Sequence, residues 1–170
     1  AGAQRRSPPA GGGGLVGVNI GANKDAPDRI ADYVSGVRRF GDVADYLTVN
    51  ISSPNTPGLR GLQSRDELAR LLSHLNAARA KLTKPVPMLL KIAPDLGPDE
   101  LGDIAACCMG HVDGVIISNT TISRPALTSR HGTETGGLSG APLFDLSTQQ
   151  LARFHVLTEG RLPLIGVGGI

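Results

Sequence analysis

Hydroxyl and amide side chains are concentrated in one short stretch of this chain, directly after an apolar run. Residues 46–51 are β-branched and apolar enough to form a buried strand, whereas residues 52–58 are a cluster of turn formers. Ser53, Asn55 and Thr56 therefore stand where a strand passes into a loop. Polar groups in that position are suited to binding a polar ligand at the carboxyl end of the strand.

The same arrangement recurs at four further places along the chain. Each apolar run ends in polar residues or glycines: Val18 precedes Asn19, Leu90 precedes Lys91, Ile117 precedes Ser118, Asn119 and Thr120, and Val167 precedes Gly168 and Gly169. Asn and Ser are ordinary turn residues, so a turn is the favoured interpretation of any one of these positions. Because the carboxyl ends of parallel strands open on one face, their recurrence favours a shared binding site.

The residue types at these strand ends define the chemistry of such a site. Amide side chains pair well with a planar ligand that has amide and imide edges, and Lys91 could neutralise charge that develops on it. The glycine pairs 136–137 and 168–169 would let backbone N–H groups approach a phosphate. The constellation has no carboxylate pair and no metal-ligand cluster. Flavin mononucleotide (FMN) meets all of these demands.

Apolar periodicity predicts strands that alternate with helices. The expected strands are 15–20, 46–51, 87–92, 114–118 and 164–167, and the expected helices are 28–40, 64–82, 98–108 and 148–158. Ser64 to Glu67 fit a capping box, and the buried faces of two helices are predicted to be Leu68, Leu71, Leu72, Leu75 and Leu82, and Leu151, Phe154 and Leu157. This alternation indicates an α/β fold with a parallel sheet. Five strands would make an incomplete portion of a (β/α)8 TIM barrel, which needs eight.

Composition and charge favour a small-molecule ligand over a nucleic acid. The 170 residues are 40% hydrophobic and 19% charged, which is ordinary for a globular protein. The formal charge is +2, the basic residues are scattered, and three Phe, two Tyr and no Trp leave few platforms for stacking on bases. Cys107 and Cys108 are adjacent, which suits neither a disulfide framework nor a zinc site. No apolar run approaches the roughly 20 residues that cross a bilayer.

The two ends of the chain predict a piece of a longer protein. Residues 1–14 are rich in Gly, Pro and Arg, and we expect a disordered tail rather than a signal peptide. The chain lacks an initiating Met and stops at Ile170, directly after a glycine pair that should lead into a loop and a helix. Residues 15–170 are therefore the expected folded part.

Five motifs together resemble the class 2, quinone-dependent dihydroorotate dehydrogenases. They are NISSPNTPGLR at 50–60, LKIAPDL at 90–96, SNTT at 118–121, ETGGLSG at 134–140 and GVGG at 166–169, in the order of that family. The resemblance runs from Gly17 to Ile170. It implies an FMN-binding (β/α)8 barrel that oxidises dihydroorotate to orotate in pyrimidine biosynthesis and passes the electrons to a membrane quinone.

The resemblance also implies what surrounds this piece. Residues 15–170 would be the central part of the barrel domain, with the first two strands and the last strand missing. The helices that dock on the membrane and admit quinone would be absent as well. Association with a bacterial or mitochondrial inner membrane is therefore expected only through segments outside this sequence, and the piece alone is expected to bind FMN weakly or not at all.

Carried over to this sequence, the resemblance implies a role for each strand-end residue. Ser53 would be the catalytic base that removes the C5 proton of the substrate, with Thr56 as its proton relay. Substrate contacts would come from Asn50, Asn55, Asn119 and Thr120. FMN contacts would come from Asn19, Asn50, Lys91, Ser118, Gly140, Gly168 and Gly169.

Three alternatives remain open from the sequence. A class 1 dihydroorotate dehydrogenase, which uses fumarate or NAD, would need Cys where Ser53 stands. A non-catalytic piece would bind ligand only or assemble only. A different barrel enzyme, acting on phosphorylated sugars, would show no yellow chromophore.

Overall fold

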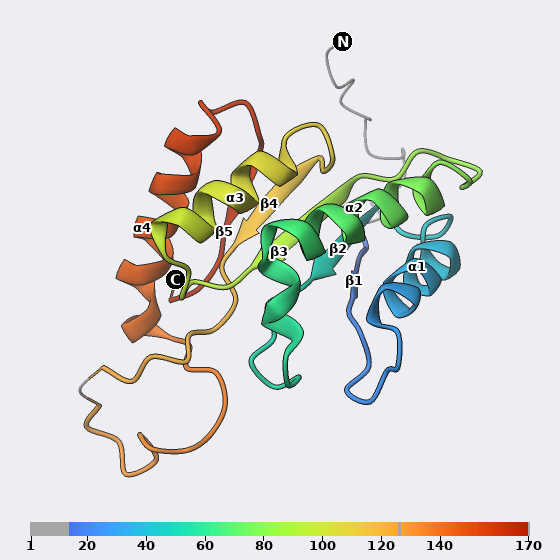
Figure 1. Ribbon diagram of the computed structural model, residues 1–170. Helices are drawn as coiled ribbons and strands as arrows, with labels where there is room; N and C mark the ends of the chain where they lie inside the picture. The colour runs from blue at the N-terminus through green and yellow to red at the C-terminus, as the bar shows by residue number, and fades with distance from the viewer. Residues whose placement is uncertain (1–13, 126, 170) are drawn as a thin grey trace.

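The computed structural model describes residues 14–125 and 127–169, which form one parallel sheet with helices packed on it (Figure 1). The strands are β1 (Gly17–Ile20), β2 (Tyr46–Asn50), β3 (Met88–Ile92), β4 (Gly114–Ile117) and β5 (Leu164–Gly166). The helices are α1 (Arg29–Phe40), the 3-10 helix η1 (Leu59–Gln63), α2 (Arg65–Arg79), α3 (Pro98–Cys108) and α4 (Ala141–Leu157). The predicted alternation of strands and helices is confirmed.

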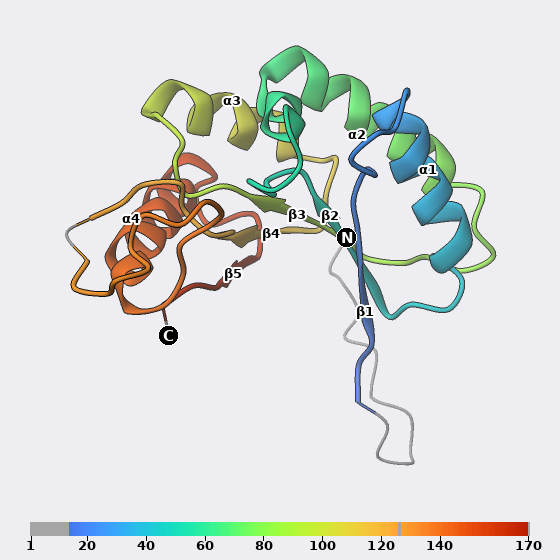
Figure 2. The same cartoon turned by 90° about the horizontal axis from the view of Figure 1, so that it is seen from below.

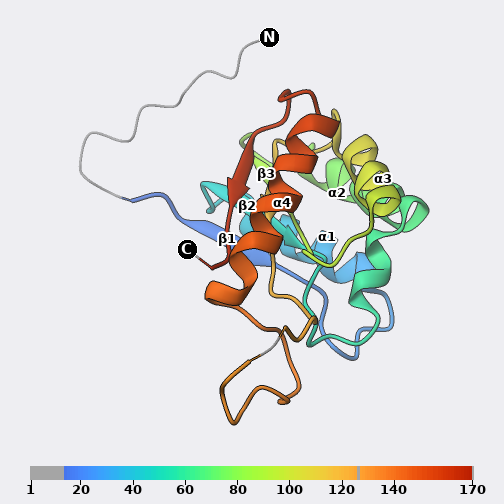
Figure 3. The same cartoon turned by 90° about the vertical axis from the view of Figure 1, so that its left-hand side faces the viewer.

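The order of the strands in the sheet follows their order in the chain. All four pairings, from β1 with β2 to β4 with β5, are parallel. Helix α1 packs beside α2, α2 beside α3 and α3 beside α4, so the helices form one layer outside the sheet (Figures 2 and 3). A doubly wound sheet would have helices on both faces. The arrangement is that of an arc of a (β/α)8 barrel, as predicted.

The face of the sheet that points to the helices is the hydrophobic core. In β3, Met88, Leu90 and Ile92 are completely buried, whereas Leu89 and Lys91 between them are half buried. Successive residues of a strand point to opposite faces, so the second set lies on the face away from the helices. The polar strand-end residues are thereby separated from the apolar core.

Helix α2 begins without the predicted capping box. The Ser64 side chain makes no capping hydrogen bond, because η1 runs directly into α2 and Ser64 itself ends η1, donating its N–H to Gly61 O at 3.2 Å. The helix ends at Arg79, so Leu82 lies beyond it, half buried against the core. The rest of the predicted face is buried as expected: Leu68, Leu71, Leu72 and Leu75.

Helix α4 begins at Ala141, well before the predicted start at residue 148. Gly140 precedes it with a φ of 78°, and Pro142 occupies the first turn, where a missing N–H costs no hydrogen bond. Gly and Pro are also loop residues, which is why the sequence did not reveal this start. Phe154 is buried as predicted, but Leu157 is 46% exposed, contrary to prediction.

The predicted strand boundaries differ from the observed ones by one or two residues. Strand β1 begins at Gly17, and Leu15 and Val16 before it are exposed. Gly17 lies against Tyr46 so closely that a Cβ there would stand 2.0 Å from the ring. Strands β2, β4 and β5 each end one residue early, because the chain already turns into its loop there.

Three further expectations concern the ends of the chain and its composition. The predicted disordered tail, 1–14, lies outside the described residues except for Gly14. Within the described ranges no helix is long and apolar enough to cross a membrane. Cys107 is half buried and Cys108 is buried, both as free thiols, as expected for small residues without a disulfide.

A leucine truncation tests whether α2 seals the core. Leu71→Ala removes a fully buried side chain, so we expect the free energy of unfolding to fall by about 2–5 kcal/mol in urea denaturation. Leu157→Ala makes the same change at a side chain that is 46% exposed, and should cost less than about 1 kcal/mol. Equal losses in the two variants would contradict this assignment of the core.

Candidate active site

Asn50 and Lys91 lie side by side at the carboxyl ends of neighbouring strands. They are register partners between β2 and β3, and Ile116 and Ile165 continue the same row across β4 and β5. Paired residues of parallel strands point to the same face, which here is the face away from the helices. Both side chains are half buried. An amide residue and a lysine therefore stand side by side on the face of the sheet away from the helices.

The Asn50 side chain is the centre of a hydrogen-bond network. Its Oδ1 accepts from Ser52 N at 3.2 Å and from Asn119 Nδ2 at 3.2 Å. Ser52 Oγ donates to Lys91 O at 2.8 Å and accepts from Asn119 Nδ2 at 3.1 Å. Thr120 N donates to Asn119 Oδ1 at 2.8 Å. These bonds fix the orientation of both amides and join the ends of β2, β3 and β4.

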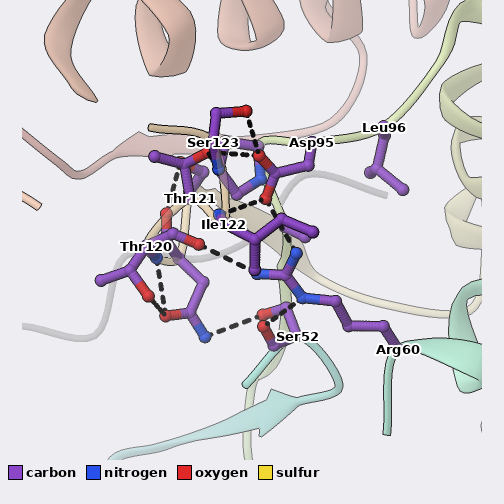
Figure 4. A network of polar contacts seen from close by, with 12 residues as sticks. Ser52, Arg60, Asp95, Leu96, Thr120, Thr121, Ile122 and Ser123 are labelled. Atoms are coloured by element: carbon purple, nitrogen blue, oxygen red, sulfur yellow. Dashed lines mark hydrogen bonds and ion pairs between the residues drawn. The ribbon is translucent and has the colours of Figure 1, made fainter. Parts of the chain in front are cut away.

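A second network, centred on Arg60 of η1, joins the same three strand ends (Figure 4). The guanidinium donates to Ser52 O at 3.2 Å and to Thr120 O at 3.0 Å, and it pairs with Asp95 at 2.8 Å. The side chains of Arg60 and Asp95 are only 21% and 13% exposed. In the Arg60–Asp95 pair both side chains are charged and largely shielded from water, so this hydrogen bond is stronger than one between neutral groups.

The Asp95 carboxylate is surrounded by donors, which Figure 4 shows converging on it. Besides Arg60, it accepts from the Thr121 hydroxyl, from Ile122 N at 3.2 Å and from Ser123 Oγ at 3.3 Å. Burial alone would raise the pKa of this carboxyl, but the hydrogen bonds from Thr121, Arg60 and Ile122 outweigh burial and hold the pKa below its usual value of 3.8. Asp95 is therefore ionised at neutral pH.

Tyr33 of α1 anchors the end of β2 from the helical side. Its ring is completely buried, and its hydroxyl donates to Asn50 O at 2.6 Å. Burial raises the pKa of Tyr33 to about 12, so the hydroxyl keeps its proton and remains a donor. The backbone of Asn50 is thus fixed by a hydrogen bond from the helical side of the sheet.

The predicted catalytic loop follows β2 and is partly open to solvent. Ser53 is half buried, and its Oγ accepts from Asn55 N at 3.3 Å. Thr56 is half buried and Asn55 is exposed. Within the described ranges no hydrogen bond joins the Ser53 and Thr56 hydroxyls. The structure thus brings the predicted base and relay into one loop without linking them directly.

At Gly137 the long loop after β4 packs against the predicted catalytic loop after β2. A Cβ at this position would lie 1.8 Å from Thr120 Oγ1 and 3.1 Å from Pro54 Cγ, so only glycine fits between the two loops. Arg124 steadies the same segment by donating to Gly136 O at 2.6 Å. Close loop packing alone therefore requires glycine at position 137, and the approach of this glycine pair to a phosphate stays a prediction.

The other predicted cofactor residues form a group at the ends of β4 and β5. Ser118 N donates to Val167 O at 2.8 Å, and the side chain of Ser118 is buried. Gly168 and Gly169 have φ values of 117° and 79°, and a Cβ at Gly169 would lie 2.6 Å from Phe144 N. These glycines therefore run past the start of α4, next to its N-cap Gly140.

Asn19 does not join either group. It pairs with Thr48 in register, one row below Asn50, and it is exposed on the edge strand β1. With Asn23 and Asp32 it lines a cavity of about 250 Å³ beside α1. Among the predicted FMN contacts, Asn19 therefore lies apart from both the Asn50 network and the group at the ends of β4 and β5.

Four residues that support the site were not predicted from the sequence: Ser52, Tyr33, Arg60 and Asp95. Ser52 looks like a turn residue, yet it is completely buried. Arg60 lies 35 residues from Asp95 and 60 residues from Thr120, so no local pattern connects them. A usable signal was present, because the basic Arg60 follows the end of β2 and the acidic Asp95 follows the end of β3, the next strand along the chain.

The fold is that of a barrel protein, and its candidate site gathers strand-end amides and one lysine. Comparison with known proteins agrees: the family model for dihydroorotate dehydrogenase matches residues 4–170. The chain belongs to the dihydroorotate dehydrogenase family, and the resemblance carried by the five motifs is confirmed.

Individual relatives give the subgroup and the extent of the match. The mitochondrial dihydroorotate dehydrogenase (quinone) of Cyclocybe aegerita is 60% identical, over 98% of this chain and 53% of its own length. That of Parvibaculum lavamentivorans is also 60% identical, over 92% of this chain and 45% of its own length. This chain spans about half the length of the curated relatives it matches.

Solved structures agree with the fold. The ligand-free dihydroorotate dehydrogenase of Eimeria tenella superposes with a TM-score of 0.88 at 42% identity, over 92% of this chain and 48% of that one. The ferulenol complex of the same protein gives a TM-score of 0.87 at 41% identity, over 91% and 46% of the two chains. The arc of five strands therefore corresponds to part of a known barrel.

The depressed pKa of Asp95 predicts a specific acid sensitivity. Such a carboxyl stabilises the fold above its unfolded pKa, and the contribution is lost as the pH falls through the lower folded pKa. Asp95→Asn should therefore flatten the fall of the free energy of unfolding between about pH 5 and pH 2.

The control is Asp103→Asn, which removes an exposed carboxylate that pairs with Arg65. Urea titrations at several pH values would measure both slopes, and the control should keep the wild-type slope. An Asp95→Asn protein with the wild-type pH dependence would contradict the assignment.

Proposed function

We propose that this chain supplies the central part, residues 15–170, of an FMN-dependent dihydroorotate dehydrogenase that passes electrons to a quinone. The observation that carries the proposal is the pair of hydrogen-bonded amides, Asn50 and Asn119, held beside Lys91 at the strand ends. Relatives that are 60% identical carry the name dihydroorotate dehydrogenase (quinone). Ser53, where class 1 enzymes would need Cys, favours class 2.

The residues present fit FMN. Gly168 and Gly169 adopt backbone angles that favour glycine, and they pass the first turn of α4, where N–H groups and the helix dipole suit a phosphate. We assign the phosphate end to Gly140, Gly168 and Gly169, and the ring to Asn50, Lys91 and Ser118, with Asn19 as a further contact. A bound FMN would supply the acceptor for the hydride that dihydroorotate loses from C6.

Lys91 would act on the cofactor through its charge. Lys91 projects from β3 on the same face of the sheet as its register partner Asn50, away from the helices. A cation fixed there stabilises a negative charge that develops on the ring as it is reduced, without reorganisation of solvent.

Ser53 would remove the C5 proton of dihydroorotate. A serine hydroxyl is a weak base, and the hydrogen bond from Asn55 N to Ser53 Oγ favours its deprotonated form. Thr56, three residues further along the same loop, would relay the proton toward solvent.

The substrate would lie against the amides that the networks orient. Asn50 and Asn119 offer fixed donors and acceptors for the amide groups of dihydroorotate, and Asn55 and Thr120 flank them. We assign contact with quinone and with the membrane surface to parts of the complete protein outside the described residues. An inner-membrane location, bacterial or mitochondrial, follows from that assignment.

Visible absorption of the complete protein that carries this chain, mixed with FMN, tests the cofactor. Binding should perturb the flavin spectrum, and adding dihydroorotate should then bleach the long-wavelength band as the ring is reduced. If the flavin spectrum of the complete protein shows binding but dihydroorotate does not bleach it, a protein that only binds ligand would be favoured. Binding of a sugar phosphate with no flavin signal would contradict the proposal.

Ser53→Ala tests the base. In the complete protein that carries this chain, we expect flavin reduction by dihydroorotate to slow by about 100- to 10,000-fold, with FMN content unchanged. Ser73→Ala, on the exposed side of α2, removes the same hydroxyl far from the site and should leave the rate unchanged. A Ser53→Ala protein that reduces its flavin at the wild-type rate would rule out this role.

A further inference from the structure

We propose that Arg60 is a positioning residue that sets the placement of the Ser53 loop relative to Asn119 and Thr120. Arg60, together with its partner Asp95, would thereby affect substrate binding and proton removal but not FMN binding. The inference rests on the proposed function of the site, because it concerns the groups assigned there to base and substrate.

The geometry of the guanidinium carries the inference. Arg60 uses three nitrogens on three strand-end loops: Nε on Ser52 O at 3.2 Å, Nη1 on Asp95 at 2.8 Å and Nη2 on Thr120 O at 3.0 Å. Ser52 directly precedes Ser53, so two of the three acceptors lie in the backbone of the base loop and the substrate loop. A planar fork with divergent donors can hold three such loops at fixed spacing, whereas the single ammonium of lysine cannot.

Asp95 extends the same hold along the substrate loop. Its carboxylate accepts from the Thr121 hydroxyl, from Ile122 N at 3.2 Å and from Ser123 Oγ at 3.3 Å. Residues 121–123 directly follow Thr120. The loop that carries the substrate amide is thus attached to the end of β3 at several successive residues.

The backbone at Arg60 is anchored independently of its side chain. Leu59 and Leu62 of η1 are buried, and Gln63 Oε1 accepts from Ala93 N at 3.0 Å. Replacing the Arg60 side chain therefore leaves η1 packed in its position, so a variant can lose the loop contacts without losing the fold.

The contacts of Arg60 separate the substrate side from the flavin side. Its described side-chain partners are Ser52, Asp95 and Thr120. They do not include the Lys91 side chain or the glycines assigned to the phosphate, which are Gly140, Gly168 and Gly169. Loss of Arg60 should therefore displace the base and the substrate amides while the phosphate end stays intact.

Steady-state kinetics of Arg60→Ala in the complete protein test this. A displacement of about 1 Å at reacting groups lowers turnover by about 100-fold, so we expect that loss in kcat/KM for dihydroorotate, with wild-type FMN content. Arg60→Lys should recover little of it. Arg65→Ala breaks an exposed arginine–aspartate pair in the neighbouring helix and should leave kcat/KM unchanged.

Amide hydrogen exchange of the same proteins gives a readout that needs no activity. In the wild type the amides of residues 120–123 are all hydrogen-bonded. Arg60→Ala should speed exchange at residues 119–123 and leave α2 and β3 as in the wild type.

Three results would overturn the inference: wild-type kcat/KM and exchange in Arg60→Ala, full recovery in Arg60→Lys, or a uniform rise in exchange with loss of FMN. A wild-type protein that does not oxidise dihydroorotate would instead contradict the proposed function. In that case exchange at residues 119–123 still decides whether Arg60 holds the two loops together.

Discussion

The site depends on one requirement, that polar groups buried at the strand ends find partners among themselves. Ser52, two residues beyond Asn50, is completely buried, and a buried unpaired polar group costs free energy. The Asn50 side-chain carbonyl meets this need by accepting from Ser52 and from Asn119. Because those donors come from different loops, satisfying them also fixes where the loops lie. Packing and ligand geometry are thus set by the same few bonds.

The two networks divide the work between neutral and charged groups. Around Asn50 the partners are amides and a hydroxyl, which hold orientation without adding charge. Among the residues of the five described strands, Lys91 is the only charged one. Around Arg60 the ion pair with Asp95 lies on the loop side, with 21% and 13% of the two side chains exposed. Keeping the ion pair away from the concave face preserves the field of Lys91 for a ligand, since an anion beside it would cancel that charge.

The fold was largely predictable because its signals are local, whereas the networks were not because their partners are distant in the chain. Buried runs such as 87–92 and leucine spacings such as Leu68 to Leu75 depend only on near neighbours. The start of α4 failed because Gly140 and Pro142 suit a loop and a helix start equally. Asn50 and Asn119 could be named from the motif resemblance, but their contact across 69 residues depends on register. Arg60 and Asp95 each follow a strand end, but 35 residues separate them and no local pattern pairs them.

Two adjacent serines illustrate what register adds to chemistry. From residue types alone, Ser52 and Ser53 are equally able to act as a base. Ser52 Oγ is completely buried and already engaged with Lys91 O and Asn119 Nδ2, so neither its proton nor its lone pairs are free for a substrate. Ser53 Oγ is half buried and accepts one hydrogen bond, from Asn55 N. The Ser53 hydroxyl accepts one hydrogen bond and is partly accessible, so it can exchange a proton with a substrate. The Ser52 hydroxyl is enclosed and fully hydrogen-bonded, so its role is to connect the strand-end loops. The prediction that Ser53 is the base thus gains a physical reason, and its neighbour becomes part of the frame that positions it.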